Sequence, residues 1–113
     1  MRRLIALTLA VALLGILAAV AVAATKTVKV GDNWFVRSSG VPTVTVKKGT
    51  TVKWNWVGKK AHNVHVTKGP ATIPASKVQS KGTYSRKFTK KGTYTIICDV
   101  HGAKDQSMKL VVK

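Results

Sequence analysis

The stretch VPTVTVKKGTTVKWNWV, residues 41–57, decides the fold class of this chain. In each half, apolar residues alternate with polar ones, and the tetrad Lys47-Lys48-Gly49-Thr50 forms a turn between the halves. A period of two is typical of a β-strand that buries one face, whereas a helix repeats its apolar residues every three to four positions. In the second half, Val52, Trp54 and Trp56 share one face. We expect Trp54 to pack in the core, whereas Trp56 stands where a polar residue would be usual.

The same alternation returns along the chain after residue 24, and turns that contain glycine or proline separate the runs. Besides the two strands within residues 41–57, we predict strands over residues 27–30, 61–67, 83–88, 93–98 and 106–112, with 83–98 forming a hairpin around a Lys-Lys-Gly turn. Short strands with one apolar face each are typical of an antiparallel β-sandwich. The predicted fold class is therefore all-β, and residues 25–113 are long enough for one domain with a single core.

The first 24 residues have the composition of an export signal. Met1-Arg2-Arg3 precedes an apolar run from Leu4 to Val20, and the small residues Ala21-Val22-Ala23-Ala24 follow. We expect cleavage after Ala23 or Ala24. The alternative is a retained membrane anchor, because the run approaches the ~20 apolar residues that a spanning helix needs. In either case the folded domain would be periplasmic or extracellular, and in the second case held at the outer face of the cytoplasmic membrane.

The chain is strongly basic, with a formal net charge of +17. Eighteen of its 20 basic residues follow residue 24, against only three acidic residues, Asp32, Asp99 and Asp105. Such a charge favours acidic partners, anionic lipid headgroups or anionic cell-wall polymers, although it can equally serve only to keep the surface solvated. Nucleic-acid binding is not expected, because the chain is exported, the lysines are scattered, and Arg37 and Arg86 are the only arginines after residue 24.

One cysteine, Cys98, stands alone in the sequence. In an exported protein an unpaired cysteine is a free thiol, half of an intermolecular bridge or a metal ligand. Cys98 ends a predicted strand, His101 follows three positions later, and His62 lies on an earlier strand. A thiolate, two imidazoles and a weak axial ligand are the donor set of a blue-copper centre. Taken singly, each of these residues would more often be a packed or surface residue, which is what we expect of His65.

Four segments, in this order, resemble those of plastocyanin-type cupredoxins: Gly49–Trp54, His62-Asn63-Val64, Gly92–Cys98 and Cys98-x-x-His101. The likeness spans roughly residues 28–112. It implies a Greek-key β-sandwich that binds one copper ion and carries single electrons, with His62, Cys98 and His101 as copper ligands. In that family the asparagine after the first ligand histidine joins the two ligand loops by hydrogen bonds, and the resemblance gives this role to Asn63.

The axial position departs from the family pattern, which usually has a methionine a few residues past the second histidine. The family spacing, counted from His101, falls on Gln106, and Met108 lies two residues further on. Alternation back from Val112 puts Met108 on the core face. We therefore expect Gln106 to be the axial oxygen donor, with Met108 packed beneath the site. Met108 stays the alternative axial ligand if the loop bulges by two residues, and Asp105 is expected to be a solvated turn residue.

Together these features predict an exported blue-copper protein that carries electrons and is not an enzyme. The aspartates form no evident carboxylate pair, and no serine–histidine–acid set is apparent. Electrons would leave a monomeric carrier through the edge of His101, towards an acidic redox partner bound transiently. Two other functions stay open: copper storage or delivery with the same ligands, and a metal-free basic β-sandwich that binds anionic surfaces. Zinc could also occupy the three ligands in vitro.

Overall fold

The structure is a computed structural model that describes residues 24–113. The predicted export segment lies outside the described residues, except for Ala24. The described chain forms eight strands and one short helix. In chain order these are β1 (Thr25–Gly31), β2 (Trp34–Phe35), β3 (Thr43–Val46), β4 (Thr50–Trp56), β5 (His65–Lys68), β6 (Thr83–Phe88), β7 (Gly92–Ile97), α2 (Gly102–Asp105) and β8 (Ser107–Val112).

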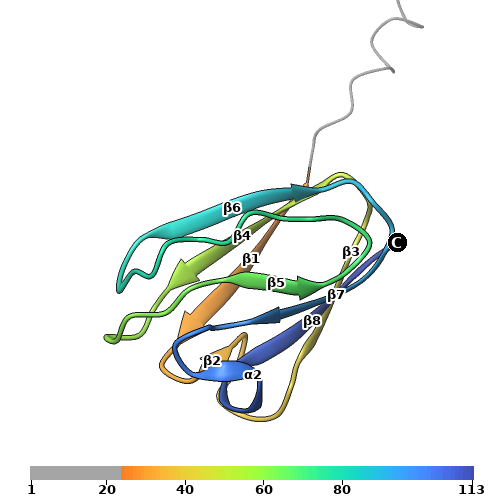
Figure 1. Ribbon diagram of the computed structural model, residues 1–113. Coiled ribbons are helices and arrows are strands. Elements are labelled where there is room, and N and C mark those ends of the chain that lie inside the picture. The colour runs from red at the N-terminus through yellow and green to blue at the C-terminus, as the bar shows by residue number, and fades with distance from the viewer. Residues whose placement is uncertain (1–23) are drawn as a thin grey trace, which may run out of the picture.

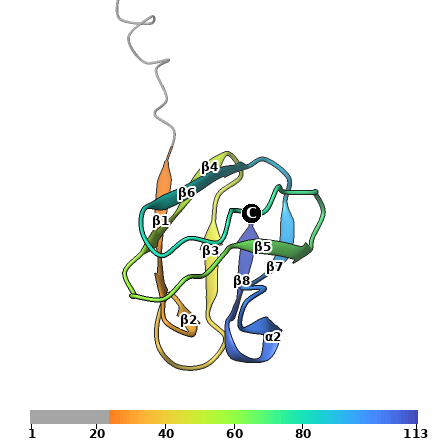
Figure 2. The ribbon, with the colours of Figure 1, turned by 60° about the vertical axis from the view of Figure 1, so that its left-hand side comes forward.

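The strands form two four-stranded sheets that pack as a sandwich (Figures 1 and 2). One sheet has the strand order β2-β1-β4-β6 and the other β3-β8-β7-β5, which confirms the predicted all-β sandwich. The sheets are mixed and not purely antiparallel, because β1 pairs with β4, and β3 with β8, in parallel. Between β1 and β4 the chain crosses to the other sheet through β3 and returns in its original direction. A period-two pattern is the same for both strand directions, so it could not distinguish parallel from antiparallel pairing.

The predicted hairpin over residues 83–98 is wrong. Its strands exist as β6 and β7, but β6 pairs with β4 in one sheet, and β7 lies between β5 and β8 in the other. The intervening turn therefore crosses between the sheets, and the Tyr94 hydroxyl donates a hydrogen bond to the carbonyl oxygen of Lys90 at 2.8 Å. Phe88 and Tyr94 meet with ring centroids 5.0 Å apart. Burying such a ring contributes about 1.5–3 kcal/mol, which favours the crossing over a local pairing.

The strand predicted over residues 61–67 is shortened to β5. His62, Asn63 and Val64 are all buried, so the alternation of a one-faced strand is interrupted before β5 begins. The backbone of His62 pairs instead with that of Gln79, and each N–H donates to the other's carbonyl oxygen at 2.9 and 3.0 Å. This isolated bridge fixes the position of His62 outside the regular sheet.

The core lies between the two sheets and is built from their inward-facing residues. Trp54, Phe88 and Tyr94 are fully buried, which confirms the core position predicted for Trp54. Trp56 is buried as well, and its indole Nε1 donates a hydrogen bond to the carbonyl oxygen of His62 at 3.2 Å. A polar residue would be usual at this position, and Trp56 instead buries its ring there and makes one polar contact through its indole N–H.

The strand directions give the sandwich two different ends. β1, β4 and β7 finish at the end where β8 begins, and Figure 1 shows α2 and β2 there. We call this the site end. The start of β1, the β3–β4 turn and the β6–β7 turn lie at the opposite end. Within residues 24–113, no helix has the length and apolar character needed to cross a membrane.

Candidate metal centre

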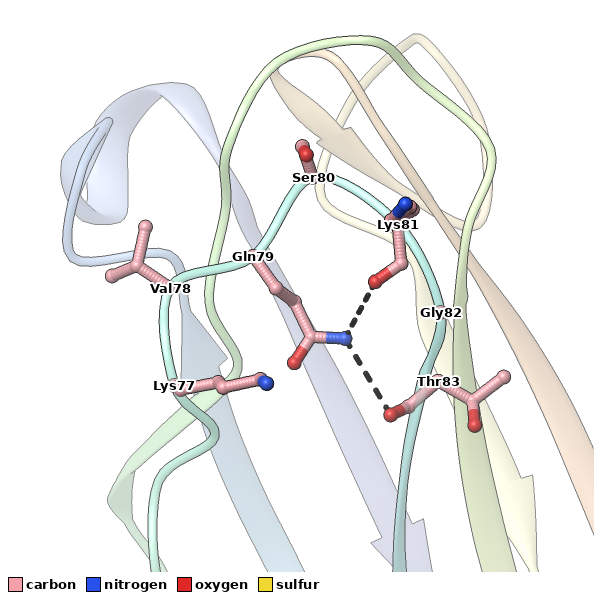
Figure 3. Close-up of a pocket in the computed structure, with 7 residues that line it drawn as sticks. All are labelled: Lys77, Val78, Gln79, Ser80, Lys81, Gly82 and Thr83. Carbon is pink, nitrogen blue, oxygen red and sulfur yellow. Dashed lines mark hydrogen bonds between the residues drawn. The ribbon is translucent and has the colours of Figure 1, made fainter.

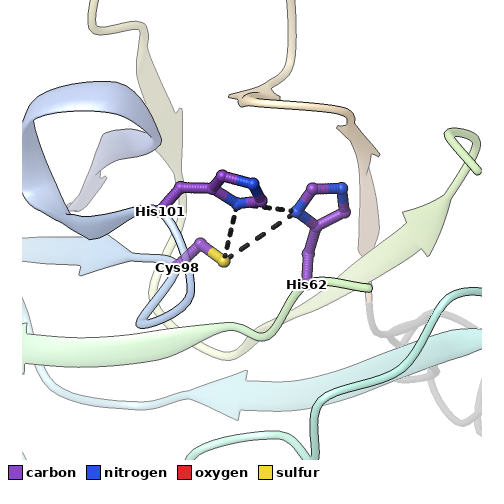
Figure 4. A group of neighbouring side chains, drawn as sticks. All are labelled: His62, Cys98 and His101. Atoms are coloured by element: carbon purple, nitrogen blue, oxygen red, sulfur yellow. Dashed lines mark hydrogen bonds between the residues drawn. The ribbon is translucent and has the colours of Figure 1, made fainter. Parts of the chain in front are cut away.

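Three donor side chains converge at the site end (Figure 4). His62 comes from the loop between β4 and β5, Cys98 directly follows β7, and His101 immediately precedes α2. The Nδ1 atoms of the two histidines lie 3.2 Å apart, and Cys98 Sγ lies 3.6 Å from His101 Nδ1 and 3.9 Å from His62 Nδ1. His62 and Cys98 are fully buried, whereas His101 is partly exposed. The structure thus brings together the three residues that the sequence indicated.

The spacing of these donor atoms fits a single metal ion. Bonds of about 2.0 Å to nitrogen and about 2.3 Å to sulfur, at about 120° in a plane, place donor atoms roughly 3.5 to 3.7 Å apart. The three observed separations range from 3.2 to 3.9 Å. One thiolate with two imidazoles in a trigonal arrangement is the donor set of a blue-copper site.

A tight turn sets the distance between Cys98 and His101. The N–H of Gly102 donates to the carbonyl oxygen of Cys98 at 2.8 Å, and the N–H of Gln106 donates to that of Gly102 at 3.0 Å. Gly102 has a φ of +79°, a left-handed conformation that glycine adopts without strain. The N–H of Cys98 donates in turn to the carbonyl oxygen of Gln106 at 3.1 Å. The loop between β7 and β8 is therefore closed by backbone bonds.

Asp32, in the turn between β1 and β2, holds the second nitrogen of His62. Its Oδ1 lies 2.8 Å from His62 Nε2, and the carboxylate also accepts hydrogen bonds from the N–H groups of Lys59 and Lys60 at 2.9 to 3.2 Å. These bonds, that with His62 foremost, hold the pKa of Asp32 well below its usual value. Because an ionised carboxylate only accepts, a neutral His62 carries its hydrogen on Nε2 and turns the Nδ1 lone pair towards the donor cluster.

Sequence analysis missed the contact between Asp32 and His62. Asp32 stands in a Gly-Asp-Asn cluster, and aspartate is common in turns for reasons of local hydrogen bonding alone. The two residues are thirty positions apart, and only the strand arrangement brings them together. No local signal in a single sequence could have found this pair. Asp105, which we expected to be a solvated turn residue, is exposed but forms the last residue of α2.

A second hydrogen-bonded group joins the two ligand loops. Asn63 accepts a hydrogen bond at Oδ1 from the N–H of Asp99, and its Nδ2 donates to Asp99 Oδ2, both at 2.7 Å. The other carboxylate oxygen of Asp99 lies 2.9 Å from Nδ1 of His65. The bonds with His65 and then with Asn63 lower the pKa of Asp99. His65 therefore lies outside the donor cluster. It is hydrogen-bonded to Asp99, in the loop that carries Cys98 and His101.

Gln106 and Met108 are both buried on the core side of the chain. The Nε2 of Gln106 donates to the carbonyl oxygens of Gly31 and Trp34 at 3.1 and 3.0 Å. Its Oε1 is buried and has no hydrogen-bond partner among residues 24–113. An unsatisfied buried acceptor costs about 1–3 kcal/mol, and a bond to a metal ion would remove this cost. Met108 is fully buried within β8, in the position of a core residue.

A cavity of about 620 Å³ lies over the loop that precedes and enters β6 (Figure 3). The residues that line it are Lys77, Val78, Gln79, Ser80, Lys81, Gly82 and Thr83. The side-chain amide of Gln79 donates to the carbonyl oxygens of Lys81 and Thr83 at 3.0 and 3.5 Å, so it holds the loop. None of the three donor residues lines this cavity. We therefore place the functional site at the donor cluster.

The fold and the donor cluster define a class of protein: a β-sandwich that presents one cysteine and two histidines as a trigonal set is a cupredoxin. Comparison with protein families agrees with this. Residues 25–113 match the model of the copper binding proteins of the plastocyanin/azurin family, and the chain belongs to this family.

Proteins similar to this chain include amicyanins. Amicyanin-alpha of Methylorubrum extorquens is 38% identical over 63 residues, which are 53% of this chain and 53% of that protein, so the match spans about half of its length. A solved structure of an oxidised methionine-to-lysine mutant of amicyanin is 32% identical, with a TM-score of 0.64, and the alignment covers 85% of this chain and 88% of the other. A methionine-to-glutamine mutant in the Cu(I) form is also 32% identical, with a TM-score of 0.64 and coverage of 79% and 82%.

Proposed function

We propose that this protein is an exported type 1 copper protein that carries single electrons between redox partners. Copper supplies a one-electron couple between Cu(I) and Cu(II). The observation that carries the proposal is the convergence of His62, Cys98 and His101 on one point at the site end, each through a single donor atom. The family membership and the similarity to amicyanins support it.

We assign the ligands from the donor atoms that no other group already occupies. His62 Nδ1, Cys98 Sγ and His101 Nδ1 would hold the ion in a plane, and Gln106 Oε1 would be the weak axial donor. Gln106 is favoured because its Nε2 is already bonded to two carbonyl oxygens while its buried Oε1 lacks a partner among the described residues. Met108, the alternative, packs as a core residue.

The surrounding bonds keep the ligands in place independently of the ion. Asp32 orients the ring of His62 through Nε2, and Asn63 ties the loop of His62 to that of Cys98. Groups that hydrogen-bond to a metal ligand without touching the metal fix the orientation of the ligand ring and raise its basicity. A site held in this way changes little when one electron is gained or lost, which keeps the barrier to electron transfer low.

The electron would enter and leave through His101. Its ring is partly exposed, whereas His62 and Cys98 have no exposed surface. Val100, the preceding residue in the chain, is 54% exposed and would offer a partner an apolar contact. The strong positive charge favours an acidic redox protein that associates transiently and more weakly at high salt, and it also permits association with anionic surfaces outside the cytoplasm.

The function is tested by voltammetry of residues 24–113 loaded with one equivalent of copper. Both sheets and the core are made of residues 25–112, so this segment is the folding unit. We expect a reversible one-electron wave in the wild type and in the control variant His65→Gln, and no wave in Cys98→Ser. If copper moved from the protein to a chelator faster than the protein exchanged electrons with the electrode, copper delivery would be the favoured function instead. A domain that binds no copper would contradict both functions.

A further inference from the structure

A cluster of lysines lies at the end of the sandwich opposite the metal centre. Lys47 and Lys48 form the β3–β4 turn, Lys90 and Lys91 the β6–β7 turn, and Lys113 follows β8. All five side chains are exposed. We call these five residues the lysine end; the two turns that carry four of them can be followed in Figure 1.

Backbone bonds hold the parts of the lysine end together. The N–H of Lys48 donates to the carbonyl oxygen of Lys113 at 2.7 Å, and the N–H of Gly49 donates to that of Phe88, also at 2.7 Å. The N–H of Thr51 donates to the carbonyl oxygen of Ala24 at 3.0 Å. The two lysine turns, Lys113 and the point where residues 1–23 join the domain are therefore neighbours.

None of the three acidic residues of the sequence lies at the lysine end. Asp32 and Asp99 are hydrogen-bonded to histidines at the site end, and Asp105 belongs to α2, at the same end. The lysine end thus carries five positive charges without a carboxylate side chain to offset them. Crowding like charges in this way lowers the stability of an isolated domain, so a counter-charge from outside is expected.

We propose that the lysine end docks the domain on an anionic lipid surface, with the metal centre facing away from it. The choice of a membrane over another acidic partner rests on the alternative in which residues 1–23 are retained as an anchor, because they would then join the domain at this end. Only residues 21–24 separate the apolar run Leu4–Val20 from β1, and four residues reach at most about 14 Å. Clustered lysines beside an apolar segment are the pattern that binds anionic headgroups. The proposal does not depend on the electron-carrier function.

The probe is co-sedimentation of residues 24–113 with vesicles of phosphatidylglycerol and phosphatidylcholine in equal parts. The test variant replaces Lys47, Lys48, Lys90 and Lys91 by Gln. The matched control replaces four exposed lysines at the site end by Gln, and so has the same net charge; these are Lys59, Lys60, Lys81 and Lys104. Urea unfolding of each variant shows that it is folded.

The wild type is expected to bind these vesicles at low salt and not to bind pure phosphatidylcholine vesicles. The test variant should bind roughly tenfold or more weakly, and the control less than about threefold more weakly. Equal losses in the two variants would show that only the diffuse net charge matters, and would overturn the proposal. So would a wild type that stays in solution, or a control that loses more than the test variant. None of these outcomes depends on copper loading.

Discussion

Asp32 Oδ1 lies 2.8 Å from His62 Nε2, while the opposite nitrogen of the same ring lies 3.2 Å from His101 Nδ1. One imidazole is thus shared between a carboxylate and the donor cluster. The carboxylate fixes which nitrogen is protonated, and this leaves the other free to bind a metal ion.

This relationship predicts that removal of the carboxylate weakens the site without touching a ligand. In Asp32→Ala, His62 loses its Nε2 partner, so both tautomers become populated in the metal-free protein. Copper affinity should fall by roughly tenfold to a hundredfold. Nitrogen NMR of the ring reports the tautomer, and competition with a chelator reports the affinity. The matched control is Asp105→Ala, which should change neither; an unchanged tautomer in Asp32→Ala would contradict the role given to Asp32.

The axial position is tested by a pair of variants. Gln106→Met offers a thioether in place of an amide oxygen, which favours Cu(I) and should raise the reduction potential. Without metal it also removes two opposing contributions to stability: the hydrogen bonds to Gly31 and Trp34, which are lost, and the unsatisfied Oε1, whose cost is relieved. Met108→Leu should leave the copper spectrum unchanged and cost less than about 1.5 kcal/mol. If the spectrum changed in Met108→Leu and not in Gln106→Met, the assignment of Gln106 would be wrong.

Asn63 is expected to stabilise the ligand loops even without copper. Asn63→Ala leaves the N–H of Asp99 without its acceptor and should lower the free energy of unfolding by about 1–3 kcal/mol. Asn55→Ala, on the outward face of β4, is the control and should change it by less than about 0.5 kcal/mol. Urea unfolding of the metal-free proteins measures both. Similar losses in the two variants would mean that the Asn63 bonds add nothing specific.

The buried hydroxyl of Tyr94 should make the protein less stable at alkaline pH. Burial raises the pKa of Tyr94 above its usual value of 10.0, so the folded state keeps the hydroxyl proton longer than the unfolded state does. The contribution of the buried Tyr94 side chain to the free energy of unfolding is complete below about pH 10. It is lost as the pH rises through the folded-state pKa. Urea midpoints measured from about pH 8 to about pH 11 should therefore fall more steeply in the wild type than in Tyr94→Phe. Parallel curves would contradict this.

Local patterns in the sequence predicted most of the strands, and they singled out His62, Cys98 and His101, which the structure brings together. Alternation reports which face of a strand is buried, and it correctly placed Trp54 and Met108 in the core. The short interval between Cys98 and His101 lies within one loop, so their proximity follows from the chain itself. These features depend on neighbours in sequence, which a single sequence displays.

The features that the sequence did not reveal depend on contacts between distant segments. The pairing of β1 with β4 and the crossing between β6 and β7 follow from how two sheets share one core, which alternation does not encode. The contact between Asp32 and His62 exists only because the end of β1 lies beside the loop after β4. Likewise, only the folded structure shows that Nε2 of Gln106 donates to backbone carbonyl oxygens while its Oε1 has no partner among the described residues.

The central claim, that His62, Cys98 and His101 form a blue-copper centre, is tested most directly by spectroscopy of residues 24–113 loaded with Cu(II). We predict an intense thiolate-to-copper charge-transfer band in the red and a narrow copper hyperfine splitting in electron paramagnetic resonance, both lost in Cys98→Ser and both kept in His65→Gln. A colourless protein, or the spectrum of ordinary tetragonal copper that Cys98→Ser leaves unchanged, would contradict the claim.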